Sequence, residues 1–98
     1  VVAFGHVGDG NLHYNLSQPP GSSREAFLAR WEEVSAGVHD RAVALGGSFS
    51  AEHGIGSLKV GELRRWRGGP EYRLMQALKA TIDPLGIMNP GKVLAGPD

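Results

Sequence analysis

The sequence contains no cysteine, so the chain can form neither a disulfide nor a thiolate metal site. Any metal ion bound by this chain must therefore take nitrogen and oxygen ligands. Ten basic residues balance ten acidic residues, and a formal net charge of zero gives no long-range field that would attract a polyanion. We expect no nucleic-acid partner.

Long apolar runs are also missing. No stretch approaches the roughly 20 apolar residues that a membrane-spanning helix needs, and the first residues lack the basic, apolar and small-residue order of a signal peptide. We expect a cytoplasmic protein, or one peripheral to a membrane. Because Val1 opens a strand-like apolar run without an initiator methionine, we also expect the 98 residues to be a piece of a longer protein.

Short strands are predicted where apolar residues run or alternate. Residues 1–4 are apolar, and residues 11–16 alternate between polar and apolar side chains, which is the period of a strand with two unlike faces. A further short strand, running into a glycine-rich loop, is predicted in residues 48–56. Strands this short need partners in a sheet.

Helices are predicted where apolar residues recur at spacings of three and four. One helix extends from a capping box at Ser22 to Leu45 and ends at the glycines that follow. Shorter helices are predicted in residues 57–66 and 70–82, before an irregular but packed tail. The side chains expected to face the core in the first and last helices are Phe27, Trp31, Val34, Val38, Leu45, Leu74, Met75, Leu78 and Ile82.

The order strand, helix, strand, helix predicts an α+β fold, a fragment of a ferredoxin-like antiparallel sheet with helices on one face. Two or three strands make a poor sheet by themselves. The exposed edge should pair with sequence outside this chain or with another copy, so the chain is expected to self-associate through it.

Two histidines flank a turn-forming stretch in GHVGDGNLHYN, residues 5–15. In a continuous strand, His6 and His13 would lie about 23 Å apart on opposite faces, and in a helix about 10 Å apart. Neither arrangement lets them bind one ion. Residues 8–11, which are Gly, Asp, Gly and Asn, accept the backbone angles of a tight reversal, and a reversal would bring the imidazoles together.

A third ligand is available in AEHGIG, residues 51–56. Two histidines and one carboxylate suit Zn²⁺ with an open position, and they also suit non-haem Fe²⁺. Because adjacent residues of an extended segment point oppositely, Glu52 and His53 should divide their roles, one binding metal and the other acting on substrate. The alternatives are turn-stabilising histidines, an ordinary Glu52–His53 surface pair and, at His39, a solvated side chain.

Three strings in this order, GHVGDGNLHYN, AEHGIG and DPLGIMNPGKVL, resemble the C-terminal domain of FAD-linked oxidases related to vanillyl-alcohol oxidase. The resemblance is to the D-lactate, glycolate and D-2-hydroxyglutarate dehydrogenase branch. It implies that residues 1–98 are the C-terminal part of a substrate domain, with the FAD-binding domain preceding them. The intact protein would oxidise a D-2-hydroxy acid to the 2-keto acid with hydride transfer to FAD, and pass electrons to an unidentified acceptor.

The resemblance also implies roles for individual residues. A divalent metal, usually zinc, would be bound by two histidines and a glutamate at the substrate pocket. His53 would act on the substrate as base or hydrogen-bonding partner, and Asn15 would belong to the pocket. The remaining implied residues are His6, His13 and Glu52 as metal ligands, and Asn89 and Lys92 returning toward the flavin.

Two other functions stay open at this point. One is a non-catalytic, metal-stabilised module that self-associates through its open sheet edge; a closed, four-ligand metal site would favour it. The other is a small Fe²⁺ oxygenase, which requires a complete pocket within the chain. As a fragment of a flavoenzyme, by contrast, the isolated chain should bind no flavin and turn over no substrate.

Overall fold

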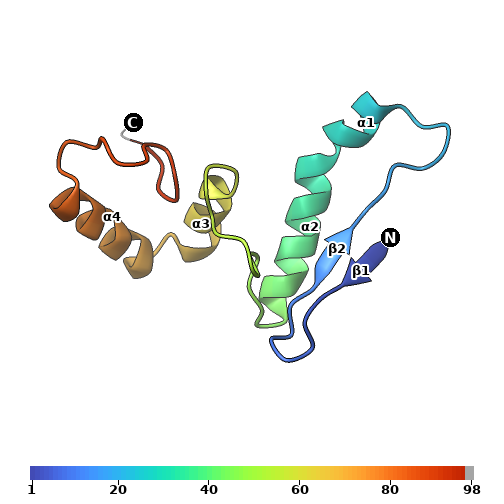
Figure 1. The fold of residues 1–98 in the computed structure, drawn as a ribbon, viewed down its shortest axis with the longest axis horizontal. Coiled ribbons are helices and arrows are strands. Elements are labelled where there is room, and N and C mark those ends of the chain that lie inside the picture. Colours follow the sequence, from blue (N-terminus) through green and yellow to red (C-terminus); the bar gives the residue numbers. More distant parts are fainter. Residues whose placement is uncertain (97–98) are drawn as a thin grey trace. The chain divides into compact units, whose positions relative to one another are not determined.

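The computed structural model describes residues 1–96, which form two compact units, Val1–Glu52 and the residues from His53 onward (Figure 1). The fold is α+β, as predicted. The first unit holds strands β1 (Val2–Phe4) and β2 (His13–Asn15) and helices α1 (Arg24–Ala29) and α2 (Trp31–Ala44). The second unit holds α3 (Val60–Arg67) and α4 (Pro70–Ile82).

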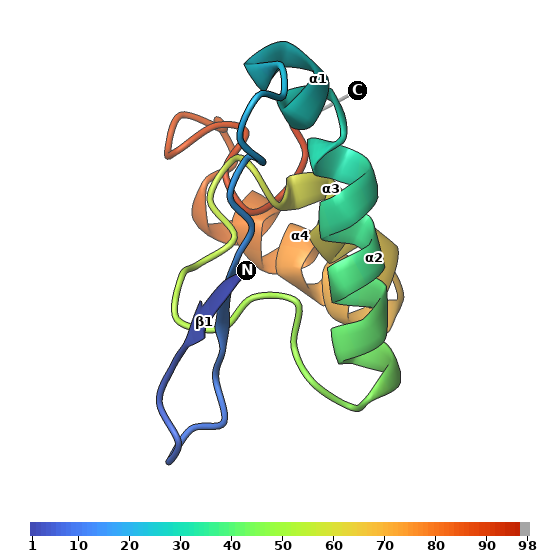
Figure 2. The same cartoon turned by 90° about the vertical axis from the view of Figure 1, so that its right-hand side faces the viewer.

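The two strands form an antiparallel hairpin in which Phe4 lies opposite His13. Figure 2 shows the chain reversing in the loop beyond β1. At the reversal, the Gly10 amide donates to the His6 carbonyl at 2.9 Å, and Gly10 has a φ of 68°, which glycine adopts without strain. The predicted reversal between the two histidines is therefore confirmed.

The helix predicted from Ser22 to Leu45 is two helices. The chain breaks at Arg30, whose amide donates to the Phe27 carbonyl three residues back and whose ψ of 4° leaves the helical range. The N-cap is Ser23, whose hydroxyl accepts from the Ala26 amide, because the Ser22 hydroxyl is engaged with the Pro19 carbonyl. The predicted end holds, since Gly46 has a φ of 80° directly after the last turn.

The strand predicted in residues 48–56 is wrong. Residues 48–53 form no strand, with bends at residues 49 and 51–53, and the Ser48 hydroxyl both donates to the Ser50 carbonyl at 2.8 Å and accepts from the Ser50 amide at 3.2 Å. These local bonds satisfy main-chain groups that a sheet would otherwise pair. The segment reaches Glu52 as an irregular chain.

A groove of about 270 Å³ separates β2 from α1 and α2. Its apolar walls include Tyr14 and Leu16 on one side and Phe27 and Val34 on the other. Trp31 also lines it but is 67% exposed, so the prediction that Trp31 lies in a closed core is wrong. The apolar stripe of the helices faces the strands, but no further layer within residues 1–52 covers it.

The second unit centres on the contact between α3 and α4. Leu63 and Tyr72 are buried there, and the Tyr72 hydroxyl accepts from the Ala95 amide at 3.2 Å. Leu74, Leu78 and Ile82, predicted to face inward, are exposed instead. No helix in the described part of the chain is both long and apolar enough to cross a membrane.

Asp83 fixes the segment that follows α4. Its carboxylate accepts from the Ile87 amide at 3.1 Å and from the Met88 amide at 3.0 Å, and Lys79 donates to the same carboxylate. Further along, the Val93 amide donates to the Gly56 carbonyl at 2.7 Å. The prediction of an irregular tail is thus confirmed for residues up to 96, but the prediction that its apolar side chains pack onto a surface is wrong for Leu85, Ile87, Met88 and Val93, which are exposed.

Candidate functional site

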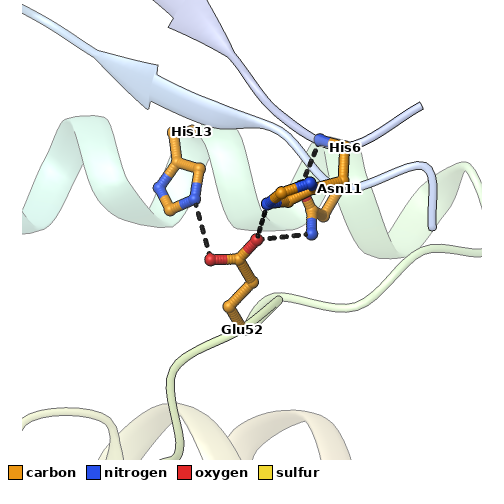
Figure 3. A network of polar contacts seen from close by, with 4 residues as sticks. All are labelled: His6, Asn11, His13 and Glu52. Carbon is orange, nitrogen blue, oxygen red and sulfur yellow. Dashed lines mark hydrogen bonds and ion pairs between the residues drawn. The ribbon is translucent and has the colours of Figure 1, made fainter. Parts of the chain in front are cut away.

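The carboxylate of Glu52 lies between the two histidines of the hairpin (Figure 3). His6 Nε2 is 2.9 Å from Glu52 Oε1, and His13 Nε2 is 3.3 Å from Glu52 Oε2. The hairpin supplies the histidines because Phe4 pairs with His13, which places residue 6 just beyond the ladder. The irregular segment after α2 supplies the carboxylate. The three side chains predicted to converge do so.

Asn11 completes this cluster. Its Nδ2 donates to Glu52 Oε1 at 2.9 Å, and its Oδ1 accepts from the His6 amide at 2.8 Å. The single side chain therefore contacts both the turn and the carboxylate that arrives from 41 residues later. Figure 3 shows the amide beside His6, with the Glu52 carboxylate reached by both.

His13 is held more firmly than His6. Its ring stacks on the Phe4 ring, with centroids 4.8 Å apart and planes 12° from parallel. The His13 side chain is 29% exposed, whereas that of His6 is 69% exposed. The cluster thus has one packed imidazole and one that faces solvent.

Hydrogen bonding keeps Glu52 ionised. The Asn11 amide, followed by the His13 imidazole, holds the pKa of the Glu52 carboxyl below its ordinary value of 4.5. Partial burial opposes this effect and the two histidine charges reinforce it. At neutral pH the group is therefore an anion, which is the form that binds a metal ion.

The described residues contain no group of three or more His, Asp or Glu side chains already arranged around a metal position. The imidazoles instead contact the carboxylate directly. Metal–ligand bonds of about 2.1 Å at a tetrahedral angle place neighbouring donor atoms about 3.4 Å apart. The His13–Glu52 distance of 3.3 Å agrees with that spacing, whereas the His6–Glu52 distance of 2.9 Å is shorter. The two imidazoles and the carboxylate can bind a divalent cation of intermediate softness if the His6 ring moves outward. The exposure of His6 leaves space for that movement.

Asn15 ends β2 and lines the groove below α1 and α2, together with Arg30 and His39. His39, expected to be solvated, is half-buried with its ring 6.3 Å from that of Phe49. His53 is exposed and is the first residue of the second unit.

Asn89 and Lys92 lie together in the second unit. The Lys92 amide donates to the Asn89 carbonyl at 3.2 Å, and both residues line an open pocket that also includes Lys79 and Met88. Asn89 has a φ of 46° and Val93 a φ of 64°. A left-handed conformation is costly for a β-branched residue such as Val93, and such strain clusters at functional sites.

Sequence reasoning missed Asn11 and Phe4 as parts of the site. The sequence predicts only a turn-forming role for Asn11, although an amide beside two potential metal ligands is a common orienting group. It predicts for Phe4 only a place in an apolar strand. The antiparallel register that pairs residue 4 with residue 13 could have identified the stack, since rings directly opposite each other in a ladder meet.

Residues 1–93 match the family described as FAD linked oxidases, C-terminal domain. The chain belongs to this family. The match covers the hairpin, Glu52, His53 and the segment through Lys92, so every proposed site residue lies within the FAD-linked oxidase C-terminal domain.

Curated relatives of this FAD-linked oxidase domain include three differently named enzymes. The chain is 43% identical over 95 residues to D-2-hydroxyglutarate dehydrogenase of Stutzerimonas stutzeri, covering 97% of this chain and 20% of that protein. It is 38% identical to glycolate oxidase subunit GlcD of Bacillus subtilis, covering 97% and 20%. It is 40% identical to D-lactate dehydrogenase of Archaeoglobus fulgidus, covering 96% and 20%.

The chain thus spans about a fifth of the length of these relatives. All three relatives are named for oxidation of a 2-hydroxy acid, and the family name implies FAD. No solved structure matched the chain significantly.

Proposed function

We propose that the chain is the C-terminal part of a flavin-dependent dehydrogenase that oxidises a D-2-hydroxy acid of the D-lactate, glycolate or D-2-hydroxyglutarate type to the 2-keto acid. FAD, bound mainly by a preceding domain, would accept the hydride, and an unidentified acceptor would take the electrons. The family match and the relatives' names support this proposal. The observation that carries the site is the Glu52 carboxylate lying between His6 and His13.

Those three side chains are proposed to hold a divalent cation, with zinc as the candidate. When bound, such a cation would acidify the hydroxyl of a 2-hydroxy acid and orient the substrate. Asn11 and His13 keep Glu52 anionic for this purpose. The exposure of His6 leaves room for the ligand to adjust, and the stacked His13 provides a fixed direction.

His53 is proposed as the residue that takes the hydroxyl proton. An imidazole suits this step because imidazoles commonly accept protons near neutral pH. A bound cation would make the substrate hydroxyl more acidic, so that a weak base could remove its proton. His53 follows Glu52 directly in the sequence, so the metal-binding carboxylate and the base would be covalent neighbours. Asn15 is proposed to contact the substrate.

Asn89 and Lys92 are proposed to face the flavin. The tight turn that joins them, with its left-handed Asn89, presents an amide and an ammonium group on one short loop. The Asp83 carboxylate anchors the start of this loop through the Ile87 and Met88 amides. A fixed loop with a positive side chain suits contact with a flavin, because a nearby positive charge stabilises the negative charge that the ring gains on reduction.

The hairpin is further proposed to be part of a larger, ferredoxin-like sheet. Within residues 1–96 the sheet has two strands, and the apolar side chains of Val2 and Phe4 are exposed on β1. Added strands from the remainder of the protein would cover them. Self-association through the same edge is the alternative.

The proposal is tested with the full-length protein that carries this chain. We expect a flavin spectrum that bleaches on anaerobic addition of one of the three D-2-hydroxy acids, and about one equivalent of divalent metal by elemental analysis. Glu52→Gln should lose the metal, whereas Glu33→Gln, which removes an exposed carboxylate paired with Arg30, should retain it. A flavin that none of the acids reduces would overturn the proposed activity.

A further inference from the structure

We propose that Asn11 is the positioning residue of this site: its side-chain amide ties the main chain at His6 to the carboxylate of Glu52 and so fixes which carboxylate oxygen remains available to a cation. The inference rests on the proposed metal-binding role of the His6, His13 and Glu52 side chains. It concerns a residue that contacts two of those ligands without being one.

The two halves of the Asn11 amide are used in opposite senses. Oδ1 accepts from the His6 amide at 2.8 Å, and Nδ2 donates to Glu52 Oε1 at 2.9 Å. Turning the amide over would set N–H against N–H at His6 and oxygen against oxygen at Glu52. One orientation therefore satisfies both contacts, and each contact selects the orientation that the other needs.

Asn11 makes the two oxygens of the Glu52 carboxylate unequal. Oε1 receives the Asn11 donor and also lies 2.9 Å from His6 Nε2, whereas Oε2 faces only His13 Nε2 among these three side chains, at 3.3 Å. Glu52 comes from a segment of bends, so no regular element orients its side chain. Fixing a flexible carboxylate before a ligand arrives reduces the conformational entropy lost on binding. The Asn11 amide supplies that restraint.

Gly5 leaves the space in which Asn11 lies. A Cβ added at residue 5 would overlap the Asn11 carbonyl oxygen and come within 3.0 Å of Oδ1. Because the overlap is with main chain, the Asn11 segment would have to shift. Gly5→Ala therefore displaces Asn11 by a route that removes no donor or acceptor.

The first test is zinc affinity of the full-length protein, measured by competition with a chromogenic chelator. Asn11→Ala should weaken binding roughly 10- to 100-fold, the usual effect of losing a group that orients a metal ligand. Gly5→Ala should weaken it in the same direction. Gln18→Ala is the matched control, since this amide donates to the Ser22 carbonyl in its own loop, and it should bind as wild type.

The second test needs no metal. In chelator-treated protein, hydrogen-exchange mass spectrometry of peptides covering residues 5–15 should show faster exchange in Asn11→Ala than in wild type. Asn11→Asp keeps an oxygen that can accept from the His6 amide, so it should retain the protection. Equal exchange in Asn11→Ala and wild type would contradict the link to His6.

The outcomes separate the two proposals. Wild-type zinc affinity in Asn11→Ala, within about twofold, would overturn the positioning role while leaving the ligands in place. A wild-type protein that binds no zinc would overturn the proposed metal site, and the exchange comparison would still decide whether Asn11 holds the turn. If Asn11→Ala does not fold, Gly5→Ala replaces it in the zinc-affinity test and Asn11→Asp is used in the hydrogen-exchange test.

Discussion

Phe4 and His13 face each other across the β1–β2 ladder with their rings stacked, 4.8 Å apart and 12° from parallel. The stack explains why His13 is the less exposed of the two imidazoles. It also leaves His13 Nε2 directed at Glu52. Phe4, which the sequence places in an apolar strand, therefore orients the proposed metal ligand His13.

Removing the stack should loosen the site. Aromatic pairs contribute about 0.5–1.5 kcal/mol beyond their buried area, so Phe4→Ala should weaken metal binding about two- to tenfold. The measurement is chelator competition on the full-length protein. Val2→Ala removes an exposed apolar side chain from the same strand without touching His13, and its affinity should not change. Equal losses in both variants would assign the effect to the strand rather than to the stack.

His53→Ala should separate chemistry from metal binding. Loss of a general base typically lowers turnover about 10²- to 10⁴-fold, whereas the proposed metal ligands, His6, His13 and Glu52, do not include His53. We therefore expect kcat for the D-2-hydroxy acid to fall while metal content, measured by elemental analysis, stays at the wild-type level. Disappearance of the metal together with activity would reverse the roles assigned to Glu52 and His53.

The loop after α4 should open in acid. Lys79, and then the Met88 and Ile87 amides, hold the pKa of the Asp83 carboxyl below its ordinary value of 3.8, against the opposing effect of burial. A lowered folded pKa means that the stabilisation is present above about pH 3.8 and is lost as pH falls from there through the folded pKa. Hydrogen exchange of peptides covering residues 83–90 should therefore accelerate below that pH.

The matched variant for this loop is Asp83→Asn, which keeps the shape of the side chain and removes the titrating group. It should exchange faster than wild type at pH 6 and show a flatter acid response in the same peptides. A wild-type loop whose protection is unchanged between pH 6 and pH 3, after correction for intrinsic exchange, would contradict the role of Asp83.

The hydroxyl of Tyr72 should contribute locally to stability. Tyr72→Phe keeps the buried ring but leaves the Ala95 amide without its acceptor, which typically costs about 0.5–1.5 kcal/mol. The Ala95 amide should therefore exchange about two- to tenfold faster. Tyr14→Phe alters an exposed hydroxyl and should leave that amide unaffected.

The convergence of the histidines was predictable because turn chemistry is local. Gly10 takes the left-handed conformation that a reversal requires, and the reversal alone brings His6 toward His13. Helix α4 could also be predicted from the sequence, since Pro70 begins it and Asp83-Pro84 follows its end. Ligand chemistry pointed to Glu52 or His53 as the third member of the site, and the choice of Glu52 came from the resemblance.

Other features depended on competition between local and distant contacts. Ser48 bonds to Ser50 where a strand was expected, and the break at Arg30 has neither proline nor glycine to signal it. Periodicity correctly found the apolar stripes of Trp31 and Leu78, but periodicity reports which face is apolar, not whether anything covers it. Ser23, one residue beyond the predicted cap, shows how finely capping depends on neighbouring bonds.

No side chain in residues 1–96 is wholly withdrawn from water, and among apolar ones only Leu63 and Tyr72 come near it. As part of the proposed flavoenzyme, this segment would draw much of its hydrophobic driving force from the rest of that protein. Substitution of Trp31 or Ile82 should weaken the packing of this segment against the rest of the proposed protein. It should not unfold a separate core within the segment. Variants of these residues should therefore be measured in the full-length protein, where loss of bound flavin or of solubility would show that the packing is weakened.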